Sequence, residues 1–355
     1  MNNAKEKKII AVHGSYYGRN FGDTLILKIV ADWVKDADPE MVVELPYVAS
    51  DAEEIEILGV AKGFSGFSSL SGVIFGPGGY FGEPPKPFFQ KLKWSAKCYK
   101  RHLSWLKRIH KYNIPYLIVG VGVGPISNVL LRRQVVKLFE GARLISVRDD
   151  VSKTFLVRWG VDPDRISVVP DVATTLRAAS MGSQKSAKKI ALHLPDVDQF
   201  VDSVNDVYEF VNDIADKYEI YIIEDGEGQL GNRNSGLLRA LSERDYHLVY
   251  YEGPDKLLQK IEEMDVVLTT KLHVGIVGYA LNKPVISIPM HTKTKRFYLQ
   301  VGRNKYCVSP EKVSLNVLRG LFEECLTLKS FRNEIRDESL RNKLLVKQFI
   351  DGLDD

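Results

Sequence analysis

Cysteine and long hydrophobic runs are both scarce in this sequence. The three cysteines, Cys98, Cys307 and Cys325, lie far apart, so they match neither a metal-binding spacing nor a disulfide framework, and they fit a reducing compartment. No apolar run reaches the ~18–20 residues of a membrane-spanning helix. The N-terminal residues MNNAKEKKII lack the apolar segment of a signal peptide. We therefore expect a cytoplasmic protein that holds no metal and no cofactor.

Acidic residues are absent from one long segment. Between Pro84 and Phe139 there are 12 Lys or Arg and no Asp or Glu, whereas the whole chain has 49 basic and 45 acidic residues. The positions between Lys86 and Lys111 alternate basic residues with large apolar ones, namely Phe88, Phe89, Trp94, Tyr99, Leu103, Trp105 and Leu106. One interpretation is a surface for anionic lipid headgroups or an anionic glycolipid at the inner face of the plasma membrane. The other is an ordinary helix with a solvated basic side. No nucleic-acid recognition motif accompanies the charge, so we expect no nucleic-acid partner.

The signatures of nucleotide-binding loops are missing at the first strand-to-helix junction. Residues 8–12 (KIIAV) predict a buried strand and residues 24–34 a helix, but the loop between them is neither GxGxxG nor a P-loop. Its glycines still allow a ligand to approach the backbone. Asp23 is a candidate helix N-cap or first-turn acid, which is its commonest role. Asn20 is a candidate ligand for a sugar or a phosphate.

What the sequence does have is a regular alternation of strand and helix patterns. Apolar strand-length runs follow one another with amphipathic segments between them, which indicates parallel α/β sheets. A length of 355 residues suits two domains. We place the boundary in the small, polar segment 178–189, giving an N-terminal domain of residues 1–180 and a C-terminal domain of residues 186–355. We expect two Rossmann-like, doubly wound domains followed by C-terminal helices.

Polar residues and glycines follow several of the predicted strands. Residues 72–75 lead into a glycine-rich loop, 76–82, in which Gly78 and Gly79 leave open backbone for a ligand or make room for a neighbouring loop. Arg148 follows the strand 144–147, where it can clamp a carboxylate or phosphate or pair with a nearby acid. His193 ends the strand 189–194. Ligands of parallel sheets bind at this edge, beside helix N-termini.

The segment 265–295 organises the second half of the chain. Residues 265–269 predict a strand, Thr270 a cap for a helix that continues to Leu281, and residues 284–289 a second buried strand followed by a loop. Lys271 and His273 then lie at a helix N-terminus on the carboxyl edge of the sheet. They are candidates for binding a phosphate and a carboxylate. The alternative is a solvated lysine and a histidine that only packs.

Several short motifs occur in the order found in the polysaccharide pyruvyl transferase family, and the chain resembles that family over residues 10–302. They are NFGDTLIL at Asn20, GPGGYF at Gly76, SVRDDVS at Ser146, PDVATTL at Pro170, and KLHVGIVGYALNKPVISIP at Lys271 with a following Lys293. The chain departs from the pattern in two places. Lys271 stands where the family usually has arginine, which keeps the charge but loses the bidentate fork, and His193 stands where arginine is frequent.

The resemblance implies a GT-B-like architecture and transfer of pyruvate from phosphoenolpyruvate to two hydroxyls of one sugar. The product is a pyruvate ketal on a glycan or glycolipid, and phosphate is released. His273 is then the candidate general acid or base, with His193, Glu224 and Asp23 as lesser candidates. Arg148, Lys271 and Lys293 are candidates for phosphoenolpyruvate. We expect the donor on the C-terminal domain and the acceptor on the N-terminal domain, near Asn20 and the 76–82 loop.

Two other functions fit the same sequence. A GT-B glycosyltransferase would use a nucleotide sugar, with Glu224 or Asp225 binding the ribose. A non-catalytic glycan-binding subunit would explain the change from arginine to Lys271.

Overall fold

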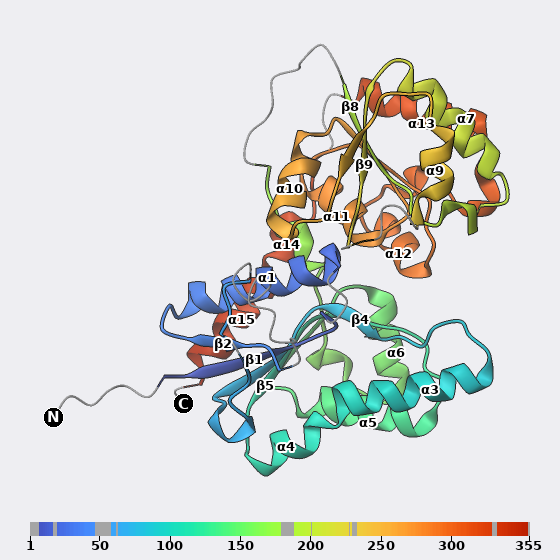
Figure 1. Cartoon of the computed structure of the whole chain (residues 1–355). Coiled ribbons are helices and arrows are strands. Elements are labelled where there is room, and N and C mark those ends of the chain that lie inside the picture. Colours follow the sequence, from blue (N-terminus) through green and yellow to red (C-terminus); the bar gives the residue numbers. More distant parts are fainter. Residues whose placement is uncertain are drawn as a thin grey trace. The chain divides into compact units, whose positions relative to one another are not determined.

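The computed structural model of the chain describes residues 7–16, 20–46, 58–61, 63–178, 188–199, 201–226, 228, 233–328 and 332–353. These residues form two compact units, each built on its own sheet (Figure 1). The first comprises residues 1–18, 26–172 and 337–355, and the second comprises 19–25 and 173–336. Most of the expected linker, residues 179–187, lies outside the described residues. The units differ from the expected domains in two segments. Residues 19–25, with Asn20 and Asp23, contact the second unit, and residues 337–355 contact the first.

The first unit contains a seven-stranded parallel sheet in the order β2-β1-β3-β5-β6-β7, with β4 also paired to β5. Its strands are β1 (Ile9–His13), β2 (Val42–Glu44), β3 (Gly72–Phe75), β4 (Gly78–Phe81), β5 (Tyr116–Val123), β6 (Leu144–Val147) and β7 (Ser167–Val168). All eight residues of β5 are buried, as a continuous apolar run predicts for a central parallel strand. The chain adds β2 on one side of β1 and then adds β3 on the other side. The switch point of the sheet therefore lies between β1 and β3.

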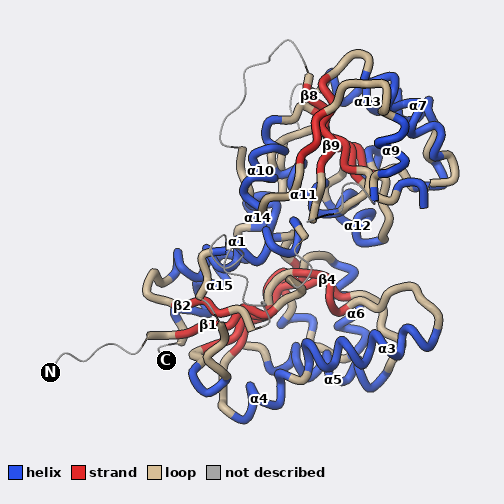
Figure 2. Tube along the Cα trace, in the orientation of Figure 1, coloured by secondary structure: helices blue, strands red, loops and turns tan. Residues whose placement is uncertain are grey.

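The expected open loop at 76–82 is partly a strand. Gly78–Phe81 pairs with β5, and Phe81 and Tyr80 pack into the core, so apolar burial overrides the glycine signal. The helices of this unit lie on both faces of the sheet (Figure 2). They are α1 (Phe21–Ala37), whose first turn belongs to the second unit, α3 (Phe88–Cys98), α4 (Trp105–Lys111), α5 (Val129–Gly141), α6 (Asp150–Trp159) and α15 (Arg341–Asp351).

The second unit contains a five-stranded parallel sheet in the order β10-β9-β8-β11-β12. Its strands are β8 (Lys189–His193), β9 (Glu219–Ile223), β10 (His247–Val249), β11 (Val266–Thr269) and β12 (Val285–Ser287). Counted within the unit this order is 3-2-1-4-5, the doubly wound arrangement, with its switch point between β8 and β11. The expectation of two parallel-sheet α/β domains is confirmed.

The helices of the second unit connect its strands or follow the last strand, β12. They are α7 (Val204–Ala215), α9 (Ser235–Ala240), α10 (Pro254–Glu263), α11 (Leu272–Ala280), α12 (Thr292–Gln300) and α13 (Leu315–Thr327). The prediction of a loop up to residue 295 is wrong, because α12 begins at Thr292. The chain continues through α14 (Arg336–Ser339) into α15, with Leu340 between them. Across the described residues, no helix combines the length and the apolar character needed to cross a membrane.

Candidate functional site

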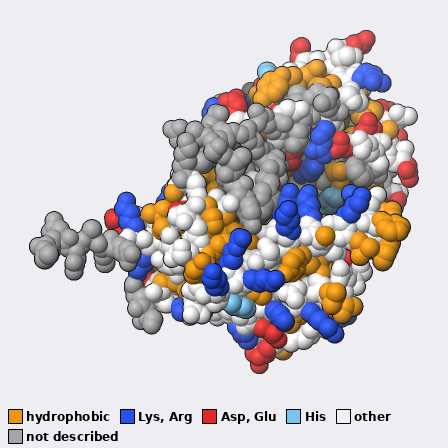
Figure 3. Space-filling model, turned by 60° about the horizontal axis from the view of Figure 1, so that its bottom comes forward, with side chains coloured by type: hydrophobic (Ala, Val, Ile, Leu, Met, Phe, Trp, Pro, Cys, Tyr) orange, Lys and Arg blue, Asp and Glu red, His pale blue; other side chains and the backbone are white. Residues whose placement is uncertain are grey.

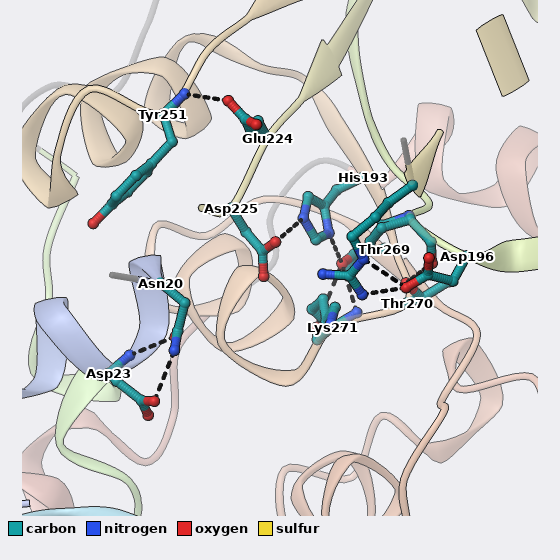
Figure 4. Close-up of polar contacts among 12 residues, drawn as sticks. Asn20, Asp23, His193, Asp196, Glu224, Asp225, Tyr251, Thr269, Thr270 and Lys271 are labelled. Atoms are coloured by element: carbon teal, nitrogen blue, oxygen red, sulfur yellow. Dashed lines mark hydrogen bonds and ion pairs between the residues drawn. The ribbon is translucent and has the colours of Figure 1, made fainter. Parts of the chain in front are cut away.

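The switch point of the second sheet brings two strand ends together. Thr269 of β11 is in register with His193 of β8, and both side chains are buried. Sheets with this order bind ligands in the crevice at the carboxyl ends of the two strands on either side of the switch point. The predicted residues His193 and Lys271 both lie here (Figure 4).

A chain of polar contacts runs across this edge. The Nδ1 of His193 lies 3.1 Å from the Thr269 hydroxyl. The Nε2 of His193 lies 3.4 Å from a carboxylate oxygen of Asp225, a residue that follows β9. Burial alone would raise the pKa of Asp225, but His193 and its hydrogen bond, together with Lys271 and Arg233, lower it to about 2. Asp225 is therefore an anion at any working pH. It holds His193 and balances charge rather than donating a proton.

A second ion pair stands beside the first. The Arg233 Nε donates to an Asp196 carboxylate oxygen at 2.7 Å, and the Asp196 backbone N–H donates to the Arg233 carbonyl at 2.7 Å. Asp196 has a φ of 57°, a left-handed conformation that non-glycine residues rarely adopt and that concentrates at functional sites. Both members of the pair act on the charge of Lys271, so they lie close to it, and Figure 4 shows Asp196 and Lys271 at this edge of the sheet.

Lys271 itself is the N-cap residue of α11, a correction to the prediction that Thr270 caps the helix. The Lys271 backbone N–H donates to the Thr269 hydroxyl at 3.0 Å, so the turn is closed from the strand side, and no side chain caps the helix. Burial lowers the pKa of the Lys271 ammonium, Arg233 lowers it further, and Asp225 and Asp196 oppose both. The cation is partly desolvated, which strengthens its attraction for an anion.

His273 lies in the first turn of the same helix and packs against α1. A Cβ added to Gly22 would lie only 2.0 Å from the His273 Nδ1, so the imidazole lies directly against the Gly22 backbone. The start of α1 is fixed to the same sheet edge, because the Phe21 backbone N–H donates to the Asp225 carbonyl at 2.7 Å. This contact between two distant segments was not predicted from the sequence.

Asn20 and Asp23 form a helix cap. The Asp23 backbone N–H donates to the Asn20 side-chain oxygen at 3.0 Å, and the Asn20 amide donates back to the Asp23 carboxylate at 2.7 Å (Figure 4). The capping role therefore falls to Asn20 rather than to Asp23. An isolated bridge joins Asn20 to Gly226, which places the pair in the second unit and not with the N-terminal domain as expected.

A further basic residue of the site was not among the residues predicted from the sequence. His291 is the N-cap residue of α12, again with no side-chain cap. Burial lowers its pKa, and the charges of Lys293 and Lys271 lower it further. These three basic groups are therefore close enough to interact. A predicted helix over residues 292–300 would have identified His291 as its N-cap residue, but the sequence analysis expected a loop there.

The remaining predicted residues lie in the first unit. Arg148 is buried, and its guanidinium lies 3.6 Å from an Asp171 carboxylate oxygen and 3.8 Å from one of Asp149. A Cβ at Gly122 would lie 2.6 Å from the Arg148 Nε, and one at Gly79 would lie 3.2 Å from its Nη2. Gly79 and Gly122 therefore make room for the guanidinium. Gly78 has a φ of 135° at the start of β4. A role of Arg148, Gly78 or Gly79 in binding substrate stays a prediction.

Solved structures with the same fold include UDP-GlcNAc 2-epimerases and a protein in complex with UDP. UDP-GlcNAc 2-epimerase from Methanocaldococcus jannaschii matches with a TM-score of 0.62 at 14% identity, over 95% of this chain and 99% of that one. The enzyme from Neisseria meningitidis, bound to UDP-GlcNAc, matches with a TM-score of 0.61 at 10% identity, over 97% and 100%. Anabaena Alr3699/HepE in complex with UDP matches with a TM-score of 0.57 at 13% identity, over 97% and 98%. At these identities the likeness establishes the GT-B-like fold and nothing further.

Comparison of sequences gives the family. No curated protein matches the chain at the significance required. The family model for polysaccharide pyruvyl transferase matches residues 20–292, a span that contains the α1 start, both strand ends at the switch point, and α11. The chain therefore belongs to the polysaccharide pyruvyl transferase family.

Proposed function

We propose that this protein transfers the enolpyruvyl unit of phosphoenolpyruvate to two hydroxyls of one sugar, on a glycan or glycolipid precursor. The product is a cyclic pyruvate ketal. The reaction balances without a cofactor: of the two hydroxyl protons, one ends in the new methyl group and the other leaves with phosphate.

The observation that carries the proposal is the gathering of basic groups at two neighbouring helix N-termini. Lys271 begins α11 and His291 begins α12, neither helix has a side-chain cap, and Lys293 follows in the first turn of α12. Phosphoenolpyruvate carries two to three negative charges near neutral pH. Free backbone N–H groups and basic side chains are the groups that bind such an anion. Its binding would relieve the repulsion that lowers the pKa of His291.

His273 is the proposed general acid or base of the reaction. A proton delivered to the methylene carbon makes C2 of the enolpyruvyl group electrophilic, and the sugar hydroxyl must lose its proton as it attacks. An imidazole in the first turn of α11, two residues after Lys271, suits both steps. Lys271, Lys293 and His291 would stabilise the departing phosphate. We assign the acceptor to the edge of the first sheet near Gly78, Gly79 and Arg148.

The test is a melting series combined with an assay of phosphate release. Phosphoenolpyruvate should raise the melting temperature of the wild type, and Lys271→Ala should lose that rise while keeping its melting temperature in buffer. Lys217→Ala, which changes an exposed lysine just after the C-terminal end of α7, should respond like the wild type. Phosphate should be released only with a sugar acceptor present. Stabilisation by UDP but not by phosphoenolpyruvate would reject the proposal.

The nucleotide-sugar alternative has one supporting observation, the UDP complexes of the structural neighbours. The two acidic residues that could bind the ribose of a nucleotide already make polar contacts within the protein. The buried Glu224 carboxylate accepts a hydrogen bond from the Tyr251 backbone N–H at 3.1 Å, and Asp225 pairs with His193. This favours phosphoenolpyruvate over a nucleotide sugar. A non-catalytic glycan-binding role would be rejected by any acceptor-dependent phosphate release.

A further inference from the structure

Large aromatic side chains are exposed at the start of α3. Phe88 is 68% and Phe89 76% exposed, and the two rings contact each other edge to face at 5.7 Å. Along the helix, the exposed positions 89, 92, 93, 96 and 97 recur at intervals of three and four, so they share one face. That face is apolar in its first turn and carries Lys93 and Lys97 in the following turns.

The start of α5 presents the same pattern. Val129 and Leu130 are exposed, Leu130 by 70%, and the exposed Arg133 and Lys137 follow one and two turns later. A groove between the two helices is lined by residues of both, including Leu92, Tyr99, Leu130, Arg133 and Lys137. The two exposed apolar ends therefore belong to one surface.

Glu83 joins the segments that precede the two helices. Its carboxylate accepts hydrogen bonds from the Ser127 backbone N–H at 3.0 Å and hydroxyl at 2.6 Å, and its own N–H donates to the Pro125 carbonyl at 2.9 Å. Lys91 of α3 also lies 3.0 Å from this carboxylate. The first turns of α3 and α5 are thus held side by side.

The structure narrows the basic, aromatic segment between Lys86 and Lys111 that the sequence singled out. Leu103, Trp105 and Leu106 are buried in the core of the unit, so they cannot contact a partner. The accessible surface, which we call the α3–α5 face, consists of Phe88, Phe89, Leu92, Lys93, Lys97, Lys100, Val129, Leu130, Arg133 and Lys137. Figure 3 views the first unit from the side of these helices, where hydrophobic side chains lie among Lys and Arg side chains.

We propose that the α3–α5 face docks on a lipid bilayer that contains anionic headgroups. Phe88, Phe89 and Leu130 would enter the boundary between headgroups and acyl chains, and the lysines behind them would contact lipid phosphates. Lysine can do this because its long apolar stem stays with the hydrophobic side chains while the ammonium reaches the polar layer. With no acid between Pro84 and Phe139, nothing within the face repels an anionic surface.

A lipid surface fits the face better than a protein partner does. Protein interfaces are depleted of lysine in their centres, whereas Lys93, Lys97 and Lys100 stand within and beside the apolar positions here. The proposal is separate from the assigned reaction. Docking would bring the enzyme to a membrane-bound acceptor, but a water-soluble acceptor would be used equally well without it.

The test is sedimentation of the full-length protein with vesicles of phosphatidylglycerol and phosphatidylcholine, compared with phosphatidylcholine alone. Binding should require the anionic lipid and should weaken as salt rises from 50 to 500 mM. Phe88→Ser with Phe89→Ser should lower the partition coefficient at least tenfold. Lys93→Glu with Lys97→Glu should lower it about 25-fold or more, since each basic residue contributes about fivefold. Phe89→Trp should be quenched by brominated lipid.

Matched controls separate docking from folding and catalysis. Leu344→Ser replaces an apolar side chain that is 64% exposed on α15, and Lys217→Glu with Lys312→Glu changes two exposed lysines of the second unit. Both should bind vesicles like the wild type. All variants should keep phosphate release with a soluble acceptor. The proposal is overturned if wild type ignores anionic vesicles, if the two double variants bind unchanged, or if RNA or a protein ligand removes the protein from the vesicles.

Discussion

At the scale of single residues, the site depends on Gly22, which takes part only by having no side chain. Gly22 gives the His273 ring its place, because every other side chain would occupy the space of the imidazole. The position of the His273 ring therefore depends on contact between two helices far apart in the chain.

We expect Gly22→Ala to reduce phosphate release by about 100-fold, close to the effect of His273→Ala, because a displacement near 1 Å is enough to misplace a catalytic group. The melting temperature should also fall, because the new methyl group would lie 2.7 Å from the His273 Cβ, and rotation of the imidazole cannot relieve that contact. Gly320→Ala is the control, because nothing lies within 4 Å of a Cβ there and alanine favours its helix. Full activity of either Gly22→Ala or His273→Ala would contradict the role assigned to His273.

At the scale of elements, a pair of buried histidines joins β1 to the turn between α3 and α4. The His13 Nε2 lies 2.8 Å from the His102 Nδ1, and His102 stacks on Tyr80 of β4 with ring centroids 4.6 Å apart. His102 lies in a π-helical turn, Tyr99–Leu103, a conformation that inserts a residue to direct a side chain inward. Burial, with Arg101 adding to it, lowers the pKa of His102 to about 3.

This shift predicts a stability that falls with acid. Because the folded pKa of His102 lies below its ordinary unfolded value of about 6.5, the unfolded chain binds the proton first, and stability is lost as pH falls from about 6.5 towards 3. The loss is about 1 kcal/mol per pH unit for one such group. His102→Phe should therefore show a shallower decline in urea-unfolding free energy between pH 6.5 and 4.5. The exposed His110→Phe should keep the wild-type slope, and equal slopes in both variants would refute the explanation.

At the scale of the whole molecule, the chain returns at its end to the unit where it began. Helix α15 packs on β5 and β6, and its buried Asn342 accepts a hydrogen bond from the Ser146 hydroxyl at 2.7 Å and donates one to the Pro170 carbonyl at 3.0 Å. The C-terminal helix is therefore a structural part of the first unit and not an appendage of the second.

Removing this link should destabilise the first unit. Asn342→Ala leaves two buried polar groups without that partner, so we expect a loss of about 2–3 kcal/mol in unfolding free energy. Lys347→Ala on the exposed side of the same helix should change it by no more than about 0.5 kcal/mol. Both are measured by chemical denaturation. A neutral Asn342→Ala would mean that α15 contributes little to the unit.

The sequence by itself determined the elements that depend on local pattern. Continuous apolar runs at 116–123 and 266–269 predicted buried parallel strands, and their alternation with amphipathic segments indicated α/β sheets. The position of Lys271 and His273 at a strand-to-helix junction followed from the same pattern, because that junction is a local feature. The resemblance to the family rested on the order of short motifs, and the family model confirms it.

The tertiary structure alone decided which distant residues meet. Strand order placed His193 beside Thr269, chain crossing brought Gly22 against His273, and the return of α15 assigned residues 337–355 to the first unit. It also turned the 76–82 loop into a strand and buried Trp105 while leaving Phe89 exposed. No periodicity encodes these outcomes, because they depend on packing between segments separated by tens to hundreds of residues. Local propensity yields wherever such packing buries more apolar surface.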